Sequence, residues 1–158
     1  MNFTLPEGCK VVEAIAPQAG ASITGDYVSL KNCSMAYVVL EMAQASATQS
    51  AITIEQDTTV DTSVSKAITV TVPIWANEDC AASDTLVRQT DAVAFTTSIA
   101  QKHKIVIFQI DPATLDQANS FDCITVKTAT SDATNITAAQ YYLVTDFPQA
   151  VPPAVITD

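Results

Sequence analysis

The sequence has few of the residues on which enzyme sites depend, with only three glycines and one histidine among 158 residues. Gly8, Gly20 and Gly25 all lie near the N-terminus, so the chain lacks a Gly-rich phosphate loop and the Gly-hinged lids common in enzymes. His103 stands between two lysines without a serine or cysteine signature motif, and we interpret it as a surface residue rather than a base or ligand. The sequence therefore predicts a protein that is not an enzyme and has no cofactor.

Basic residues are also scarce, at seven Lys and Arg against seventeen Asp and Glu, for a net charge of -10. The bases are scattered, apart from Lys102 and Lys104 on either side of His103. Affinity for nucleic acid depends largely on Lys and Arg that displace counterions from phosphates. We therefore expect no direct binding to nucleic acid.

Long apolar runs and paired cysteine motifs are missing. No run approaches the roughly 18 residues that span a bilayer, and the N-terminal residues lack the basic and apolar regions of a signal peptide. We expect a protein made in a reducing cytoplasm without a membrane partner. The four cysteines are widely spaced and contain no C-x-x-C pair, so free thiols are favoured over two disulfides. They are Cys9, Cys33, Cys80 and Cys123.

The central stretch of the chain has three apolar runs separated by polar breaks: Tyr27 to Leu30, Met35 to Met42 and Ala51 to Ile54. Runs of this length predict strands, and their succession predicts a β-meander. Both alternating faces of the second run are apolar, with Tyr37 and Val39 opposite Val38 and Leu40. This pattern is typical of a central strand covered on both sides.

Further strands are predicted on both sides of this stretch. The clearest alternation is at Ile68 to Val72, and Asp111 followed by Pro112 predicts the start of a short helix that ends at Asn119. The remaining predicted strands are Lys10 to Ile15, Ala92 to Ile99, Lys104 to Ile110, Phe121 to Lys127 and Ala138 to Thr145. Eight or nine short strands with one small helix predict an all-β fold, an antiparallel β-sandwich of jelly-roll type.

The distribution of proline divides the chain into three parts. Residues 1–21 predict an extended N-terminal arm, residues 22–147 the β-sandwich domain, and residues 148–158 a Pro-rich C-terminal tail. We expect the tail to be extended and to lie on the surface or on a partner.

Carboxylates gather once, at Glu78 and Asp79 with Asp84 and Asp91 nearby. Oxygen ligands of this kind bind Ca²⁺, and a β-sandwich hydrolase could use them, but the spacing does not match a calcium loop. We interpret the segment as a solvated loop and predict no metal site. The pair Asp111 and Asp116 has a similar explanation, since an N-cap role for Asp111 needs no catalysis.

Trp75 follows a strand-ending proline at the start of a long polar segment. A lone tryptophan at this position is either a core residue that closes the sandwich or an interface anchor, since Trp is enriched among binding hot spots. We favour the core and keep the interface as the alternative.

Seven stretches between about Gly25 and Asp146 form a recognisable set: GDYVSLKN, YVVLEM, AITIEQ, KAITVTVPIWAN, ASDTLVRQTDA, KIVIFQIDPATLD and FDCITVKT. Together they resemble a family of small proteins encoded among the structural genes of tailed bacteriophages. The resemblance implies a virion component, most like a capsid decoration (cement) protein. Such proteins are commonly β-rich, assemble as trimers or other homo-oligomers, and lie on the outer capsid surface, where they bridge neighbouring major capsid subunits; the resemblance favours a homotrimer.

The resemblance and the extended ends together indicate where a partner would bind. We predict partner contacts at Lys10 and Val12 in the arm, at Trp75, and at Phe147, Pro152 and Pro153 in the tail. A tail or head-to-tail component, or a surface module that recognises host glycans, is the alternative function.

Overall fold

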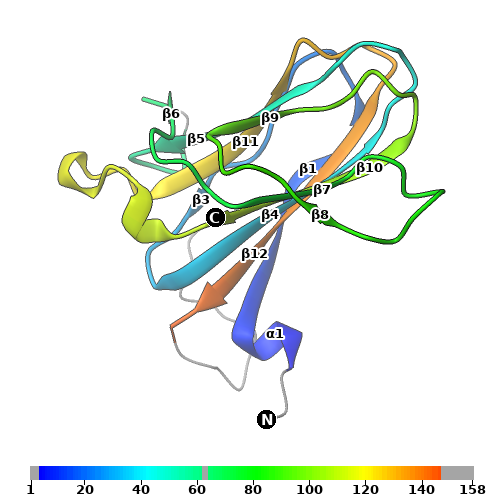
Figure 1. The fold of residues 1–158 in the computed structure, drawn as a ribbon. Helices are drawn as coiled ribbons and strands as arrows, with labels where there is room; N and C mark the ends of the chain where they lie inside the picture. Colours follow the sequence, from blue (N-terminus) through cyan, green and yellow to red (C-terminus); the bar gives the residue numbers. More distant parts are fainter. Residues whose placement is uncertain (1–3, 62–63, 147–158) are drawn as a thin grey trace.

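The computed structural model describes residues 4–61 and 64–146, which form two antiparallel β-sheets packed face to face (Figure 1). Sheet A has the order β1 (Cys9–Ala19), β12 (Ile136–Thr145), β4 (Cys33–Ala43), β10 (His103–Ile110), β7 (Ile74–Asn77), β8 (Val87–Arg88). Sheet B has the order β2 (Ile23–Thr24), β11 (Cys123–Ala129), β5 (Ala51–Asp57), β6 (Lys66–Ala67). In addition, β3 (Val28–Ser29) pairs with β11, and β9 (Ala94–Thr96) pairs with β5. The predicted all-β sandwich is confirmed, while the jelly-roll connection stays a prediction.

The core lies between the sheets and is built from alternate residues of the long strands. On β4 the side chains of Ala36, Val38 and Leu40 are fully buried, and on β10 those of Val106 and Phe108. Sheet B contributes Ile52, Ile54, Ile124 and Val126. The alternation follows from the two-residue repeat of a strand, which places every second side chain on the same face.

The predicted β-meander is wrong. Strand β4 belongs to sheet A, whereas β3 and β5 both belong to sheet B and pair with β11. The segment from Gln44 to Ser50 carries the chain from one sheet to the other. Hydrophobic alternation specifies that each run is a strand, but the choice of neighbour depends on contacts between residues far apart in the sequence.

Two further local predictions also fail. The residues from Ile68 to Val72 form no strand, although Ile68 and Val72 are buried, because only Val72 has a bridge partner, Ala92. The predicted helix is instead two short 3-10 turns, η1 (Pro112–Thr114) and η2 (Gln117–Asn119). The predicted cap is present, since the side chain of Asp111 accepts a hydrogen bond from the backbone N–H of Ala113 at 2.8 Å.

The segment predicted as an extended arm is part of the sandwich. The four-residue helix α1 (Leu5–Gly8) leads into β1, which is eleven residues long and pairs with β12 along most of its length. Pro17 is tolerated there because β1 lies at the edge of its sheet. Only α1 and the residues before it precede the first sheet strand.

Candidate functional site

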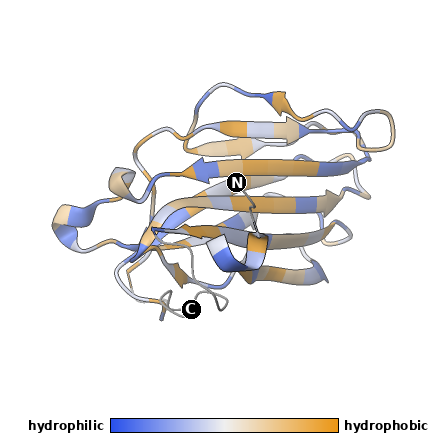
Figure 2. Cartoon of the chain, turned by 90° about the horizontal axis from the view of Figure 1, so that it is seen from below, coloured by the Kyte–Doolittle hydropathy of each residue, from blue (hydrophilic) through white to orange (hydrophobic). Residues whose placement is uncertain are grey.

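The outer face of sheet A, the face turned away from the core, is rich in apolar and aromatic side chains. Cross-strand pairing places Tyr142 beside Tyr37, and Ile107 between Val39 and Trp75. All five side chains are half-buried. The hydropathy colouring shows apolar residues along the strands of this sheet (Figure 2). We call the surface formed by these five residues the apolar face.

A groove of about 280 Å³ lies at one end of the apolar face. Only apolar and aromatic residues and one cysteine line it: Leu5, Cys9, Tyr37, Val39, Ile107, Tyr142 and Val144. Helix α1 contributes Leu5 at the rim, so the short helix shapes the end of the groove. The phenol of Tyr142 donates a hydrogen bond to Oε1 of Gln140 at 2.8 Å. The groove therefore offers aromatic ring surface and no charged side chain.

Trp75 marks the opposite margin of the apolar face. Its indole is half-buried on the outer side of β7, and the guanidinium of Arg88 lies 4.8 Å from the ring centroid. A cation over the face of an indole is attracted to the ring electrons. Arg88 also forms an ion pair with Asp91. The core role that the sequence favoured for Trp75 is wrong, because its side chain is absent from the core between the sheets.

A second depression, of about 420 Å³, lies at the start of β10. Its lining is mixed, with the apolar residues Ile105, Ile136 and Ala138 beside Glu41 and His103. The exposed side chain of His103 lies there at the start of β10. In the described ranges, 4–61 and 64–146, no group of three or more His, Cys, Asp or Glu side chains is arranged to hold a metal ion.

The carboxylates of the loop after β7 are engaged by different lysines. A carboxylate oxygen of Glu78 lies 3.7 Å from Nζ of Lys104, and one of Asp79 lies 3.1 Å from Nζ of Lys102. The ion pair with Lys102 holds the pKa of Asp79 below its ordinary value. Two adjacent carboxylates bound to separate cations do not present the converging pair that acid–base hydrolysis requires.

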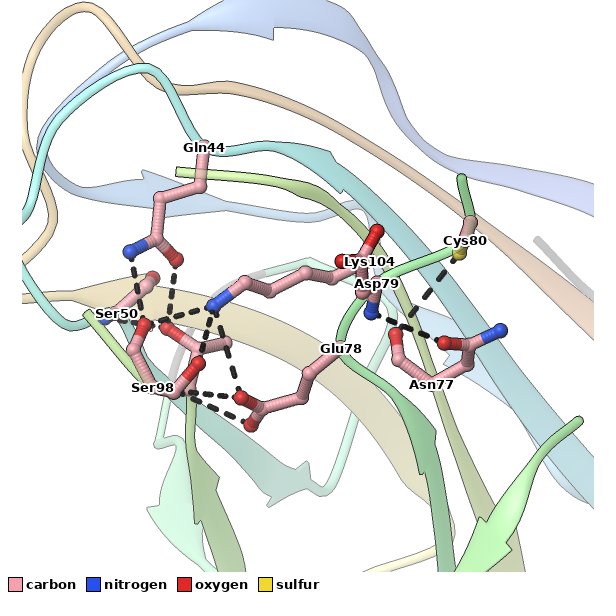
Figure 3. A network of polar contacts seen from close by, with 9 residues as sticks. Gln44, Ser50, Asn77, Glu78, Asp79, Cys80, Ser98 and Lys104 are labelled. Carbon is pink, nitrogen blue, oxygen red and sulfur yellow. Dashed lines mark hydrogen bonds and ion pairs between the residues drawn. The ribbon is translucent and has the colours of Figure 1, made fainter. Parts of the chain in front are cut away.

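Lys104 is a charged residue that lies inside the protein, with a side chain that is only 1% exposed. Its ammonium group donates hydrogen bonds to the backbone carbonyl and the hydroxyl of Ser98, at 2.7 and 2.9 Å. Glu78 supplies the opposite charge (Figure 3). Burial lowers the pKa of Lys104, and the carboxylate of Glu78 opposes that effect.

The surroundings of Lys104 indicate a structural role. The two oxygens of Ser98 accept hydrogen bonds from the ammonium group of Lys104, and the carboxylate of Glu78 is its ion-pair partner at 3.7 Å. Gln44 donates to the same Ser98 carbonyl at 2.9 Å and accepts from Thr97 at 3.0 Å. The network fastens the ends of β4, β7 and β9 together (Figure 3). A lysine with this burial and these partners has no open position for a substrate, in spite of its lowered pKa.

The structure separates the predicted partner-binding residues. Val12 is 6% exposed and packs in the core, so its side chain is not available to a partner. Lys10 is half-buried and pairs with Leu143, whose side chain faces the core. Trp75 lies on the apolar face, while Phe147, Pro152 and Pro153 lie outside the described residues.

Sequence reasoning missed Tyr37, Val39 and Tyr142 as surface residues. It assigned Tyr37 and Val39 to a strand buried on both faces, but both are half-buried on the outer side of β4. The signal was the apolar character of both faces of β4, which also occurs when one face awaits a partner. Tyr141 and Tyr142 likewise lie on opposite faces of β12, and only Tyr141 is fully buried.

In the part of the chain that the structure describes, no helix has the length and apolar character to cross a membrane. In comparisons with known proteins, no family model and no curated protein sequence matches the chain.

Proposed function

We propose that this protein is a non-enzymatic component of a tailed-bacteriophage virion that decorates the outer surface of the head. In this proposal it stabilises the capsid by bridging major capsid subunits and docks through the apolar face of sheet A. The observation that carries the proposal is the collection of half-buried Tyr37, Tyr142, Ile107 and Trp75 on one flat outer surface. The sequence resemblance to phage structural proteins supplies the class of partner.

The chemistry of the apolar face suits a protein partner. Tyr and Trp are enriched among interface hot spots because they bury a large area at a small cost in conformational entropy. Charged side chains lie at the margin, with Arg88 beside Trp75 and Glu41 in the second depression. An apolar centre with a polar rim is the usual anatomy of a specific interface.

The net charge of -10 supports an external position on the head. It disfavours contact with packaged DNA, since like charges repel and nucleic-acid binding needs clustered cations. Because a protein that lines the inside of the shell would contact the packaged DNA, the same argument favours a decoration protein on the outside.

A host-glycan module is a weaker alternative. Tyr141 is fully buried and therefore cannot contact a sugar, and the groove beside Tyr142 lacks the polar side chains that bind sugar hydroxyls. A tail or head-to-tail component is separated from a head protein by the experiment below.

The test is binding of the purified protein to expanded heads, measured by co-sedimentation and located by electron microscopy. We expect saturable binding at junctions between capsid subunits. If the protein does not bind heads and is found in tails or outside virions, the proposal is contradicted. If the apolar face is the contact, the double substitution Tyr37→Ser and Tyr142→Ser should weaken binding by tenfold or more, since a hot spot contributes about 2 kcal/mol.

Val87→Ser is the matched control for that variant. Val87 is apolar and 56% exposed, and it lies on β8 at the far edge of sheet A. This substitution should leave head binding unchanged. Equal effects of the control and the double variant would show that the apolar face is not the contact.

We also propose that the protein forms a homo-oligomer, with a trimer favoured by the resemblance. Light scattering at tens of micromolar protein should give the trimer mass. A strictly monomeric mass would contradict the trimer without affecting binding of single copies to the head.

A further inference from the structure

The groove at the end of the apolar face is lined mainly by aromatic and aliphatic side chains. Five of its seven lining residues are half-buried and Leu5 is 41% exposed, so the groove is open along the described part of the chain. Its walls include the rings of Tyr37 and Tyr142 from neighbouring strands. An apolar trough lined by aromatic rings is the kind of surface that receives an extended, proline-rich segment.

The chain itself has a segment of that chemistry next to the groove. Strand β12 ends at Thr145, one residue after Val144, which lines the groove. Residues 147–158, FPQAVPPAVITD, therefore begin three residues beyond a groove wall. We call residues 147–158 the tail segment.

The composition of the tail segment matches the groove. It contains three prolines and four larger apolar residues, and Asp158 is its only charged side chain in a chain with a net charge of -10. The apolar residues are Phe147, Val151, Val155 and Ile156. Proline fixes φ near the polyproline II value, so such a segment loses little conformational entropy when it binds in an extended form.

We propose that the tail segment binds in the groove of its own chain, against the rings of Tyr37 and Tyr142. The distance is well within reach. From Val144 to Gln140, which is paired with Val39 at the inner end of the groove, β12 advances ~13 Å at ~3.3 Å per residue. Twelve residues of polyproline II extend ~37 Å at ~3.1 Å per residue. A segment tethered this closely has a local concentration in the millimolar range, so a weak intrinsic affinity is sufficient.

Occupation of the groove has a consequence for assembly that rests on the proposed function. The tail segment and a capsid subunit would compete for Tyr37 and Tyr142. The apparent affinity for the head then falls by the fraction of molecules with an open groove. The tail segment thus shields an apolar surface in the free protein and yields it on the virion.

Nuclear magnetic resonance on the full chain tests the contact directly. We expect nuclear Overhauser effects between the ring protons of Pro152 or Pro153 and those of Tyr37 or Tyr142. They should persist on dilution and disappear in the double variant Tyr37→Ser and Tyr142→Ser, but not in the control Val87→Ser. Proline signals at random-coil positions without contacts to either tyrosine would overturn the proposal. Contacts that vanish on dilution would also overturn it, because the tail segment would then come from a second copy.

Head binding tests the competition separately. The double variant Pro152→Ser and Pro153→Ser should weaken the binding of the tail segment to the groove, and it leaves the residues of the groove unchanged. If the tail segment closes the groove in about nine molecules of ten, this variant binds heads about tenfold more tightly. Unchanged or weaker binding overturns the competition. If the tail segment contacts the tyrosines but no variant binds heads, only the proposed function is refuted. If the protein binds heads but the tail segment makes no contact with the tyrosines, only the proposal for the tail segment is refuted.

Discussion

The phenol oxygen of Tyr141, on sheet A, accepts a hydrogen bond from the backbone N–H of Val126, on sheet B, at 3.0 Å. The same hydroxyl donates to the backbone carbonyl of Asp26 at 2.9 Å. Tyr141 is fully buried, and burial raises its pKa. One side chain thus joins the two sheets through the core, and it satisfies a backbone N–H on β11 and a backbone carbonyl between β2 and β3.

Replacing Tyr141 by Phe should remove both hydrogen bonds while keeping the ring. The buried N–H of Val126 would lose its partner, and the partly buried carbonyl of Asp26 would lose one too, so the free energy of unfolding should fall by about 1–3 kcal/mol. Urea denaturation measures the change. Tyr142→Phe is the matched control, because it removes a hydroxyl bonded only to the exposed Gln140 and should cost under about 0.5 kcal/mol. Similar losses in the two variants would contradict the bridging role of Tyr141.

Gly25 lies where the chain passes between two strands. A Cβ at this position would be 2.9 Å from the carbonyl oxygen of Ala14 and 3.0 Å from that of Val126. Both are backbone atoms, and the N–H of Gly25 already donates to the Val126 carbonyl at 2.8 Å. Gly25→Ala should therefore lower the free energy of unfolding by roughly 1–3 kcal/mol, since the extra methyl must push strands apart.

Gly20→Ala is the comparison for Gly25→Ala. Its added Cβ would approach Cγ1 of Ile23 at 3.0 Å, and a side chain moves more easily than a strand. We expect a smaller loss of stability, also because alanine restricts the unfolded chain. Thermal unfolding of the two variants side by side decides between a local packing cost at Gly25 and a general cost of replacing glycine.

The Lys104 network predicts an unusual dependence of stability on pH. In Glu78→Gln the buried ammonium group loses its counter-charge, so the pKa of Lys104 should fall further below 10.5. Between the lowered folded pKa and 10.5, the unfolded state binds more protons than the folded state, so stability rises with pH in that window. The variant should be destabilised at pH 7 and should recover part of the loss by pH 10, relative to the wild type. A constant deficit from pH 7 to 10 in urea denaturation would show that Glu78 does not act through the charge of Lys104.

Because of the thiols of Cys33 and Cys123, we expect the stability of the wild type to fall as the pH rises above 9. Burial raises the pKa of each from 9.0 to about 12. The folded state therefore keeps protons that the unfolded state releases. The stabilisation is complete below pH 9 and is lost as the pH rises through 9 toward 12, at up to ~1.4 kcal/mol per pH unit for each thiol. Lys104 opposes this trend with a single group.

Urea denaturation under reducing conditions from pH 8 to 10.5 measures that slope. The double variant Cys33→Ala and Cys123→Ala should show a flatter dependence of stability on pH, even if its stability at pH 8 is lower. An unchanged slope would mean that both thiols ionise as easily in the folded protein as in the unfolded chain.

Local sequence patterns located most of the long strands correctly. The apolar run at Lys104 to Ile110 became β10 (His103–Ile110), and Ala138 to Thr145 lies within β12 (Ile136–Thr145). These segments have a strict two-residue alternation of buried and half-buried side chains, which is a property of the strand itself. In the described part of the chain, the alternating segment around Val70 has no neighbouring strand to pair with, and the strand predicted there is wrong. The side chain of Val70 is 45% exposed, although the alternation predicts that it lies on a buried face.

The candidate site was less accessible to prediction. The sequence singled out Trp75 as a notable side chain, but it placed Tyr37 in a strand predicted to be buried on both faces and did not single out Tyr142 within its predicted strand. Tyr37 and Tyr142 are 105 positions apart and meet only because β4 and β12 are neighbours in sheet A. The pairing of β1 with β12 places Val12 beside the buried Tyr141, so one predicted contact residue belongs to the core.

The sequence alone determined the β character of the chain, its acidity, the Asp111 cap and the scarcity of residues suited to catalysis. These depend on composition and on side chains close together in the chain. Only the tertiary structure decided which strands share a sheet, which of two apolar faces is buried, and that the buried Lys104 has Glu78 as its counter-charge. The reason is physical, since a period of two distinguishes the two faces of a strand but does not specify which face will be covered or by which partner.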